Sequence, residues 1–320
     1  MPGAARQPLW LDCDPGHDDA FAIITALHRA DLVGVSVVSG NAPVHLCERN
    51  ALVTLQLAGA EDVPVHRGAD RPLVREPRYA PHIHGESGLD GPALPPLTLE
   101  ARPEAAIKAI IEASLRVPGL WLVAVGPLTN VAIALRDDPG LARRLAGISI
   151  MGGNWGPGNI TPVAEFNVWA DPDAAAEVLA SGANIVMAGL DLTHQFMIGA
   201  QRKRAVRDLG TPLATFGADL LDFFSDAYAR TFSVPAEGPL HDPCAVLAVT
   251  DPHLFTSSRR HVAVETASDL TRGMTVVDRR TGNVVAEANV TVLETIDDEA
   301  AFELLLGALE ATAGTMEATA

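Results

Sequence analysis

An acidic segment, Asp12–Ala20 (DCDPGHDDA), constrains the fold of this chain more than any other stretch. A short apolar run, Pro8–Leu11, precedes it and is typical of a buried strand, whereas the apolar run that follows is compatible with a helix. A Pro-Gly pair ends the strand, and Asp18 or Asp19 can cap the helix. The acids therefore stand where a parallel strand passes into a helix, which is where open α/β sheets place their binding sites.

Four carboxylates in this segment, those of Asp12, Asp14, Asp18 and Asp19, repel one another unless a cation binds among them. Oxygen ligands of this kind favour a hard divalent ion such as Ca²⁺. A solvated, helix-capping turn is the first alternative, and it would explain Asp18 but not two acids at the end of a strand. A phosphatase that forms an aspartyl phosphate is the second alternative, because it also places two alternating acids after a strand.

Strand-like and helical patterns alternate along the rest of the chain. Strand-like runs lie at 32–38, 63–65, 120–125, 147–151 and 185–188, and polar residues repeatedly follow them. A helical region at 201–232 is followed by strand-like runs at 261–266, 274–278 and 283–292, with a hairpin turn at 281–283, and by a helix at 299–309. The pattern predicts an α/β fold, an open, mostly parallel, doubly wound sheet with a small C-terminal β-hairpin region, as one domain over residues 1–320.

Two stretches stand outside this alternation. Segment 70–103 is rich in proline and has little periodicity, and loops of this length are usually functional or disordered. His82 and His84 lie near its centre, which favours a functional loop, although His82 also fits a solvated surface. Residues 313–320 are expected to form a frayed tail.

Composition excludes several classes of partner. Lys and Arg number 23 against 40 Asp and Glu, so the formal charge is -17, and such a surface repels the phosphates of nucleic-acid polymers. No apolar run reaches the length of a membrane span, and the N-terminal sequence does not resemble a signal peptide. Cys13, Cys47 and Cys244 show neither disulfide nor metal-binding spacing. The cytoplasm is therefore the expected compartment.

Several motifs, taken in order, resemble those of the inosine-uridine preferring nucleoside N-ribohydrolases over nearly the whole chain. Besides the acidic segment they are Gly40-Asn41, the segments 84–91, 126–130, 151–153 and 159–167, and His241-Asp242. This resemblance implies a Ca²⁺-dependent enzyme that hydrolyses the N-glycosidic bond of ribonucleosides to ribose and free nucleobase. It also implies a homodimer or homotetramer.

The resemblance further implies roles for particular residues. The Ca²⁺ ligands would be Asp14, Asp19, Asp242 and the backbone carbonyl of Thr129, with Asp14 as the general base toward a calcium-bound water. The departing base would receive a proton from His241, with His84 as the second candidate. The residues expected to hold the ribose are Asp18, Asn41, Asn159, Glu165 and Asn167.

Two aromatic residues are further candidates for substrate contact. Phe166 is expected to pack against the sugar. Tyr228 is expected to stack on the nucleobase, although the aromatic residues near it also fit the apolar face of a core helix. Asp12 receives no role from the resemblance beyond support of the turn.

Two alternatives to a nucleoside hydrolase make different demands on the sequence. A phosphatase needs a Lys at the end of a later strand, but the only lysines, Lys108 and Lys203, stand on helical segments. A non-catalytic nucleoside or sugar sensor would be marked by loss of a metal ligand or of the general base, and this sequence keeps all of these residues. The preference for purine or pyrimidine is left open, because mobile loops supply the contacts to the base.

Overall fold

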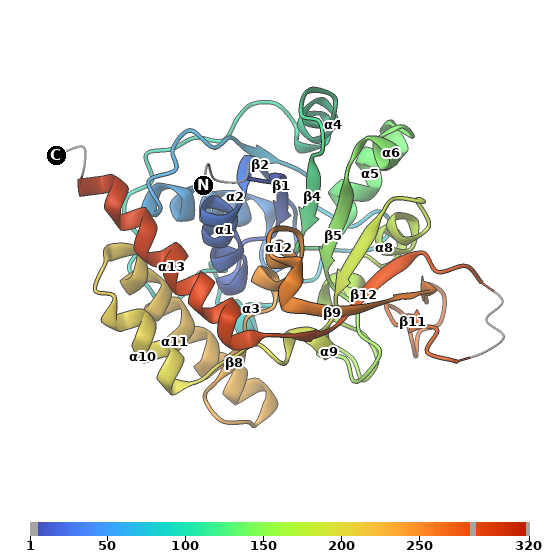
Figure 1. Ribbon diagram of the computed structural model, residues 1–320. Coiled ribbons are helices and arrows are strands. Elements are labelled where there is room, and N and C mark those ends of the chain that lie inside the picture. Colours follow the sequence, from blue (N-terminus) through green and yellow to red (C-terminus); the bar gives the residue numbers. More distant parts are fainter. Residues whose placement is uncertain (1–5, 282–285, 318–320) are drawn as a thin grey trace.

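A computed structural model describes residues 6–281 and 286–317, and an eight-stranded sheet forms its centre (Figure 1). The strands lie in the order β3-β2-β1-β4-β5-β6-β12-β9, and all neighbours are parallel except β12 and β9. In that order their bounds are Val65–Arg67, Asp31–Val37, Pro8–Cys13, Trp121–Ala124, Gly147–Met151, Ile185–Ala188, Val290–Ile296 and Phe255–Arg260. The predicted open, mostly parallel sheet is confirmed.

Helices cover both faces of the sheet, as a doubly wound fold requires. Strand β1 shows why, because Leu9 and Leu11 belong to one apolar cluster and Trp10, between them, belongs to the other. On the first face lie α1 (His17–Arg29), α2 (Val44–Leu57), α10 (Ala200–Asp208), α11 (Pro212–Phe232), α12 (Asp242–Thr250) and α13 (Asp298–Glu317). On the second face lie α4 (Ala106–Arg116), α5 (Thr129–Asp137), α6 (Leu141–Arg144) and α8 (Pro172–Leu179).

The direction in which the chain adds strands reverses at β1. The chain goes from β1 to β2 and β3 on one side and then continues with β4 on the other side of β1. The loops that leave the carboxyl ends of β1 and β4 therefore diverge, and a crevice opens between them. The acidic segment leaves β1 at this point, so the predicted location of the site agrees with the topology.

Short elements complete the loops around this end of the sheet. They are α3 (Pro81–His84), α7 (Phe166–Ala170), α9 (Leu190–Thr193), the 3₁₀ helix Pro252–Leu254, and a two-stranded pair of β7 (Met197–Ile198) and β8 (Gly238–Pro239). Segment 70–103 contains α3 and is otherwise irregular in agreement with its sequence. None of the helices in the described part combines the length and apolar character that crossing a bilayer requires.

The C-terminal strands pair differently from the prediction. The small antiparallel hairpin consists of β10 (Val262–Val264) and β11 (Thr275–Val277), whereas β12 joins the main sheet between β6 and β9. The edge strand β9 was not predicted, because its sequence FTSSRR lacks the apolar alternation of a half-buried strand. Part of the proposed turn at 281–283 lies outside the described residues. Helix α13 continues to Glu317, so it includes most of the segment expected as a frayed tail, and residues 318–320 lie outside the described part.

Candidate active site

The acidic segment folds back on itself at the start of α1. Asp19 accepts hydrogen bonds from the backbone N–H of Asp14 at 3.0 Å and from that of Gly16 at 2.9 Å. Gly16 is the N-cap of α1, so Asp19 caps the helix as the sequence allowed. The carboxylates of Asp14 and Asp19 are completely buried, which holds them rigidly below the surface.

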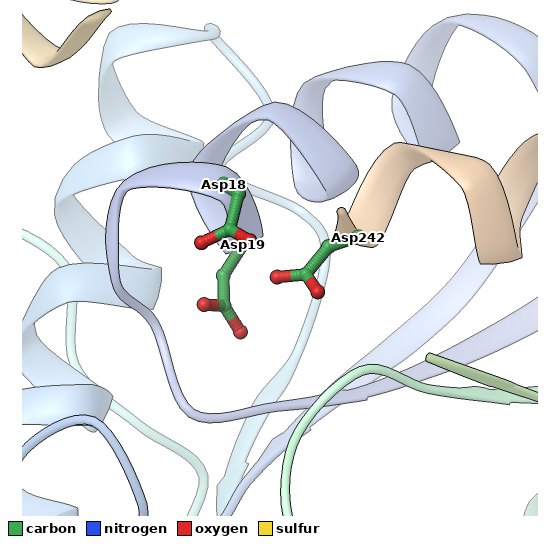
Figure 2. A group of neighbouring side chains, drawn as sticks. All are labelled: Asp18, Asp19 and Asp242. Carbon is green, nitrogen blue, oxygen red and sulfur yellow. The ribbon is translucent and has the colours of Figure 1, made fainter. Parts of the chain in front are cut away.

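Asp242, the first residue of α12, brings a further carboxylate to this segment (Figure 2). Oxygen atoms of Asp18, Asp19 and Asp242 lie within 4.8 Å of one another, and all three side chains are buried. Burial raises the pKa of Asp18 to about 8, and it raises the pKa of Asp242 well above its ordinary value, with the charge of Asp18 as the next contribution. Like charges this close in a buried site favour a bound cation, so the cluster can hold a metal ion.

Asp14 lies beside this group rather than within it. Its Oδ2 accepts a hydrogen bond of 2.6 Å from the backbone N–H of Asn41, but its Oδ1 has no hydrogen-bond partner among the described residues. Two glycines make room for the carboxylate, because a Cβ on Gly40 would lie 2.0 Å from Oδ2 and one on Gly126 would lie 2.5 Å from Oδ1. The free, buried oxygen fits a cation or a polar ligand, which is the arrangement expected of a metal ligand or base.

Thr129, whose carbonyl was the fourth predicted ligand, is the first residue of α5 and is buried. Its hydroxyl donates a hydrogen bond of 2.7 Å to Asp171. The assignment of its carbonyl to the ion stays a prediction.

A single pocket brings together every side chain predicted to contact substrate. Those residues, with His241 and Asp242, are Asp18, Asn41, His84, Asn159, Glu165, Phe166, Asn167 and Tyr228. His82 lines the same pocket while it remains exposed to solvent. Apolar side chains that the sequence did not single out complete the walls: Ile83, Val125, Met151, Ile160, Phe224 and Phe232. The pocket therefore combines a polar, acidic end with apolar walls, the usual composition of a small-molecule site.

Three asparagines have their amide groups fixed by the hydrogen bonds they make to the protein. Asn41 donates both amide hydrogens, to the carbonyl of Asp14 and to Oδ2 of Asp19, and Asn167 donates both of its own to the carbonyls of Val125 and Met151. The Oδ1 atoms of these two residues are therefore left as acceptors. Asn159 is oriented the other way, because its Oδ1 accepts from the N–H of Phe166 and leaves the amide as a donor.

Glu165 caps the short helix α7 and is held by its own backbone surroundings. Its oxygens accept hydrogen bonds from the N–H groups of Asn167, Gly153 and Val168 at 2.7, 3.0 and 3.1 Å. Burial outweighs these bonds and raises the pKa of the Glu165 carboxyl to about 6.

His241 is oriented by a residue that the sequence did not indicate. The hydroxyl of Thr193, at the end of α9, lies 2.7 Å from Nδ1 of His241. Burial, and then the neighbouring ring of His194, holds the pKa of His241 well below its ordinary value. Tyr228 is also tied to this group, because its hydroxyl lies 3.4 Å from Nε2 of His194. The motif after β6 was visible in the sequence, but nothing there linked Thr193 or His194 to His241.

His84 also has a neighbour that the sequence did not indicate. This neighbour is His17, which belongs to the acidic segment. The two Nδ1 atoms are 3.1 Å apart, and Nε2 of His17 lies 2.9 Å from the carbonyl of Asp90. The ring of His17 stacks on Phe223 with the ring centres 5.1 Å apart, and burial lowers its pKa to about 4. The position of His17 within the motif was the only available signal for it.

The chain is similar to known proteins over nearly its whole length. The family profile described as inosine-uridine preferring nucleoside hydrolase matches residues 9–303. The pyrimidine-specific ribonucleoside hydrolase RihA of Citrobacter koseri is 44% identical over 303 residues, 93% of this chain and 96% of that protein. RihA of Escherichia coli K12 is 43% identical over 309 residues, 95% and 98% of the two chains.

Solved structures give the same result. A purine-preferring ribonucleoside hydrolase from Gardnerella vaginalis superposes with a TM-score of 0.90 at 31% identity, covering 96% of this chain and 99% of that one. The plant nucleoside hydrolase PpNRh1 superposes with a TM-score of 0.86 at 30% identity and the same coverage. On its sequence, its fold and the residues gathered in its pocket, the chain belongs to the inosine-uridine preferring nucleoside hydrolase family.

Proposed function

We propose that the protein hydrolyses the N-glycosidic bond of ribonucleosides, with pyrimidine nucleosides as the preferred substrates, and releases ribose and the free base. The reaction class follows from the family. The pyrimidine preference is supported by the RihA proteins, which are described as pyrimidine-specific and are 43–44% identical to this chain. The purine-preferring enzyme from Gardnerella vaginalis is more distant, at 31% identity.

The observation that carries this proposal is the convergence of hydrogen-bond acceptors on the carboxylate cluster. Oδ1 of Asn41, Oδ1 of Asn167 and the carboxylate of Asp18 all belong to side chains that line the acidic end of the pocket. Ribose hydroxyls can donate to such acceptors and can also approach a cation, whereas a phosphate would be repelled by the same carboxylates. The acidic end therefore suits the sugar, and the apolar walls suit the planar base.

The residues present fit a calcium ion. Asp19 and Asp242 would hold it, with the free Oδ1 of Asp14 and the carbonyl of Thr129 completing the ligand set and Asp18 left for the ribose. A calcium ion bound there would supply positive charge that lowers the pKa of a neighbouring water.

Two side chains then carry the proton transfers. Asp14 is the proposed general base, because its buried carboxylate keeps one oxygen free of hydrogen bonds and can take a proton from the attacking water. His241 is the proposed donor to the departing base, held in place through its Nδ1 by Thr193. The surrounding carboxylates stabilise the positive charge that develops on the ribose as the bond breaks.

Two further expectations belong to this proposal. A homodimer or homotetramer is expected from the family resemblance and can be checked by light scattering. The three cysteines are buried and unpaired, which supports the reducing cytoplasm as the compartment.

The decisive experiment measures ribose release from uridine, cytidine, inosine and guanosine by the purified protein, before and after EDTA treatment and after calcium is restored. We expect release from uridine and cytidine at the highest kcat/KM, loss of activity with EDTA, and recovery with calcium. Higher kcat/KM for inosine or guanosine would contradict the pyrimidine preference. Tight binding of nucleosides without any ribose release would identify the alternative, a non-catalytic nucleoside-binding protein, and release of phosphate from phosphate esters alone would identify a phosphatase.

A further inference from the structure

Asp12, the first carboxylate of the acidic segment, does not line the pocket. Its side chain is completely buried near the end of β1, separated from Asp14 only by Cys13. One of its oxygens, Oδ1, accepts two hydrogen bonds, from the hydroxyl of Ser36 at 2.5 Å and from the amide of Asn130 at 2.8 Å. A buried carboxylate outside the pocket needs a reason of its own, because burial costs free energy that must be offset by its partners.

Asn130, the second residue of α5, uses all of its amide group in this arrangement. Besides the bond to Asp12, its Nδ2 donates to the carbonyl of Val37 at 3.1 Å, and its Oδ1 accepts from the N–H of Ala69 at 2.8 Å. Gly68 allows this close approach, since a Cβ there would lie 2.2 Å from Oδ1. The side chain of Asn130 therefore joins the start of α5 to β1, to the end of β2 and to the loop after β3.

We infer that Asp12 and Asn130 form a bracket that positions the first turn of α5 against the end of β1, and that its role is to set the geometry of the metal site. This inference rests on the proposed function, because it concerns the calcium site assigned there. The two bracket residues lie close in the chain to proposed ligands but are distinct from them: Asn130 directly follows Thr129, and Asp12 stands two residues before Asp14. Positioning residues behind metal ligands commonly change metal affinity by about 10- to 100-fold when they are removed.

Among the described residues, backbone hydrogen bonds hold the strands together but do not attach the first turn of α5 to β1. The ladder between β1 and β2 and that between β1 and β4 fix the strands, and the N–H of Val125 also donates to the carbonyl of Asp12 at 2.8 Å. The chain leaves the sheet after Val125, and the bracket from Asn130 is a side-chain tie that brings the start of α5 back to β1. Ser36 differs in this respect. Its hydroxyl donates to Asp12 and accepts the indole N–H of Trp10, and within the part of the chain that the structure describes it makes no hydrogen bond to α5.

The test is the calcium dissociation constant of the EDTA-treated full chain, measured by isothermal titration calorimetry, together with the melting temperature of each calcium-free variant. We expect Asp12→Ala and Asn130→Ala each to weaken calcium binding by about 10- to 100-fold. We expect Asp12→Asn to stay within about threefold of the wild type, because the amide oxygen can still accept from both partners. In the double variant Asp12→Ala/Asn130→Ala the loss should be much smaller than the product of the single losses, since both remove the same contact.

Ser36→Ala is the matched control, because it removes a hydrogen bond to Asp12 without releasing α5. It should lower the melting temperature and leave calcium affinity within about threefold of the wild type. Equal calcium affinity in the wild type, Asp12→Ala and Asn130→Ala would overturn the bracket and leave Asp12 a core residue, even if the melting temperatures fall. If Asp12→Ala does not fold, Asn130→Ala alone decides by the same criterion. A wild type that binds no calcium would instead refute the proposed metal site, and the bracket's role with it.

Discussion

Replacement of His241 tests protonation of the leaving nucleobase separately from ribose binding and activation of the water. Burial lowers the pKa of the imidazole, and the hydroxyl of Thr193 contacts Nδ1, so Nε2 is the nitrogen left to meet the substrate. Negative charge that develops on a departing uracil raises the pKa of the neighbouring imidazole, which opposes the effect of burial. The ring can then carry a second proton and donate it from that nitrogen to the leaving base. A leaving group that is already stable as an anion has no such need.

The expected losses follow from these contacts. General acids contribute about 10²–10⁴-fold, so His241→Ala should lower kcat for uridine by this factor, equivalent to about 3–5 kcal/mol. Thr193→Val removes one buried hydrogen bond of 2.7 Å and leaves Nδ1 unpaired. Such a loss costs about 1–3 kcal/mol, so kcat for uridine should fall by about 5- to 150-fold if orientation of the ring matters in the transition state.

The assay compares uridine with p-nitrophenyl riboside, whose nitrophenolate leaves without a proton. Hydrolysis of the riboside still requires the ribose contacts and the general base Asp14, neither of which the two substitutions remove. The rate of riboside hydrolysis should therefore stay nearly unchanged in both variants. Asp14→Ala serves as the control in which both substrates fall together. Equal losses for the two substrates in His241→Ala would refute a proton donor at this position and leave His241 a structural residue beside Asp242. No loss for either would move the donor elsewhere, with His84 and Tyr228 as the next candidates.

Three further predictions concern the metal site, the sugar and the stability of the fold. Asp14→Ala should abolish nearly all turnover and weaken calcium binding, as measured by calorimetry, and full activity with stoichiometric calcium would contradict its role as base and ligand. The kcat/KM for 2′-deoxyuridine should be lower than for uridine by a factor on the order of 10⁴, because buried acceptors lose their donor, and comparable values would show that the 2′-hydroxyl is not read. Arg29 donates two hydrogen bonds to Asp251, which with Thr250 outweigh burial and lower the pKa of that carboxyl. The stabilisation is therefore present above the unfolded pKa of about 3.9 and is lost as the pH falls through the lower folded value. Arg29→Met should reduce the unfolding free energy at pH 7 by about 1–2 kcal/mol, with a smaller difference from the wild type near pH 2, and equal denaturation curves at pH 7 would contradict this.

The fold of the main sheet could be predicted because its signals are local. Buried parallel strands need short apolar runs, and the helices between them need apolar positions at helical spacing, so both patterns are written in neighbouring residues. Strand β9 escaped prediction because an edge strand with polar side chains has no such pattern, and its place was decided by pairing with β12. The hairpin turn was predicted at 281–283, so β11 was expected to pair with the strand that follows it. It pairs instead with β10, the strand before it, because strand pairing depends on contacts across the fold that local patterns do not specify.

The family resemblance, rather than a pattern within the sequence, named several residues for one site. Residues as far apart as Asn41, Asn159 and Tyr228 were expected in one site from the family resemblance, and all three line the same pocket. The acidic segment could be identified as a site from its charge alone, because several carboxylates at the end of a strand repel one another unless a cation binds among them.

Only the tertiary structure decided how these residues act on one another. It leaves the oxygens of Asn41 and Asn167 as free acceptors and sets Thr193 against His241. It also gives Asp12 a partner in α5, more than a hundred residues away along the chain. Hydrogen bonds form where atoms meet in space, and no spacing within a sequence states which distant donor an acceptor will meet.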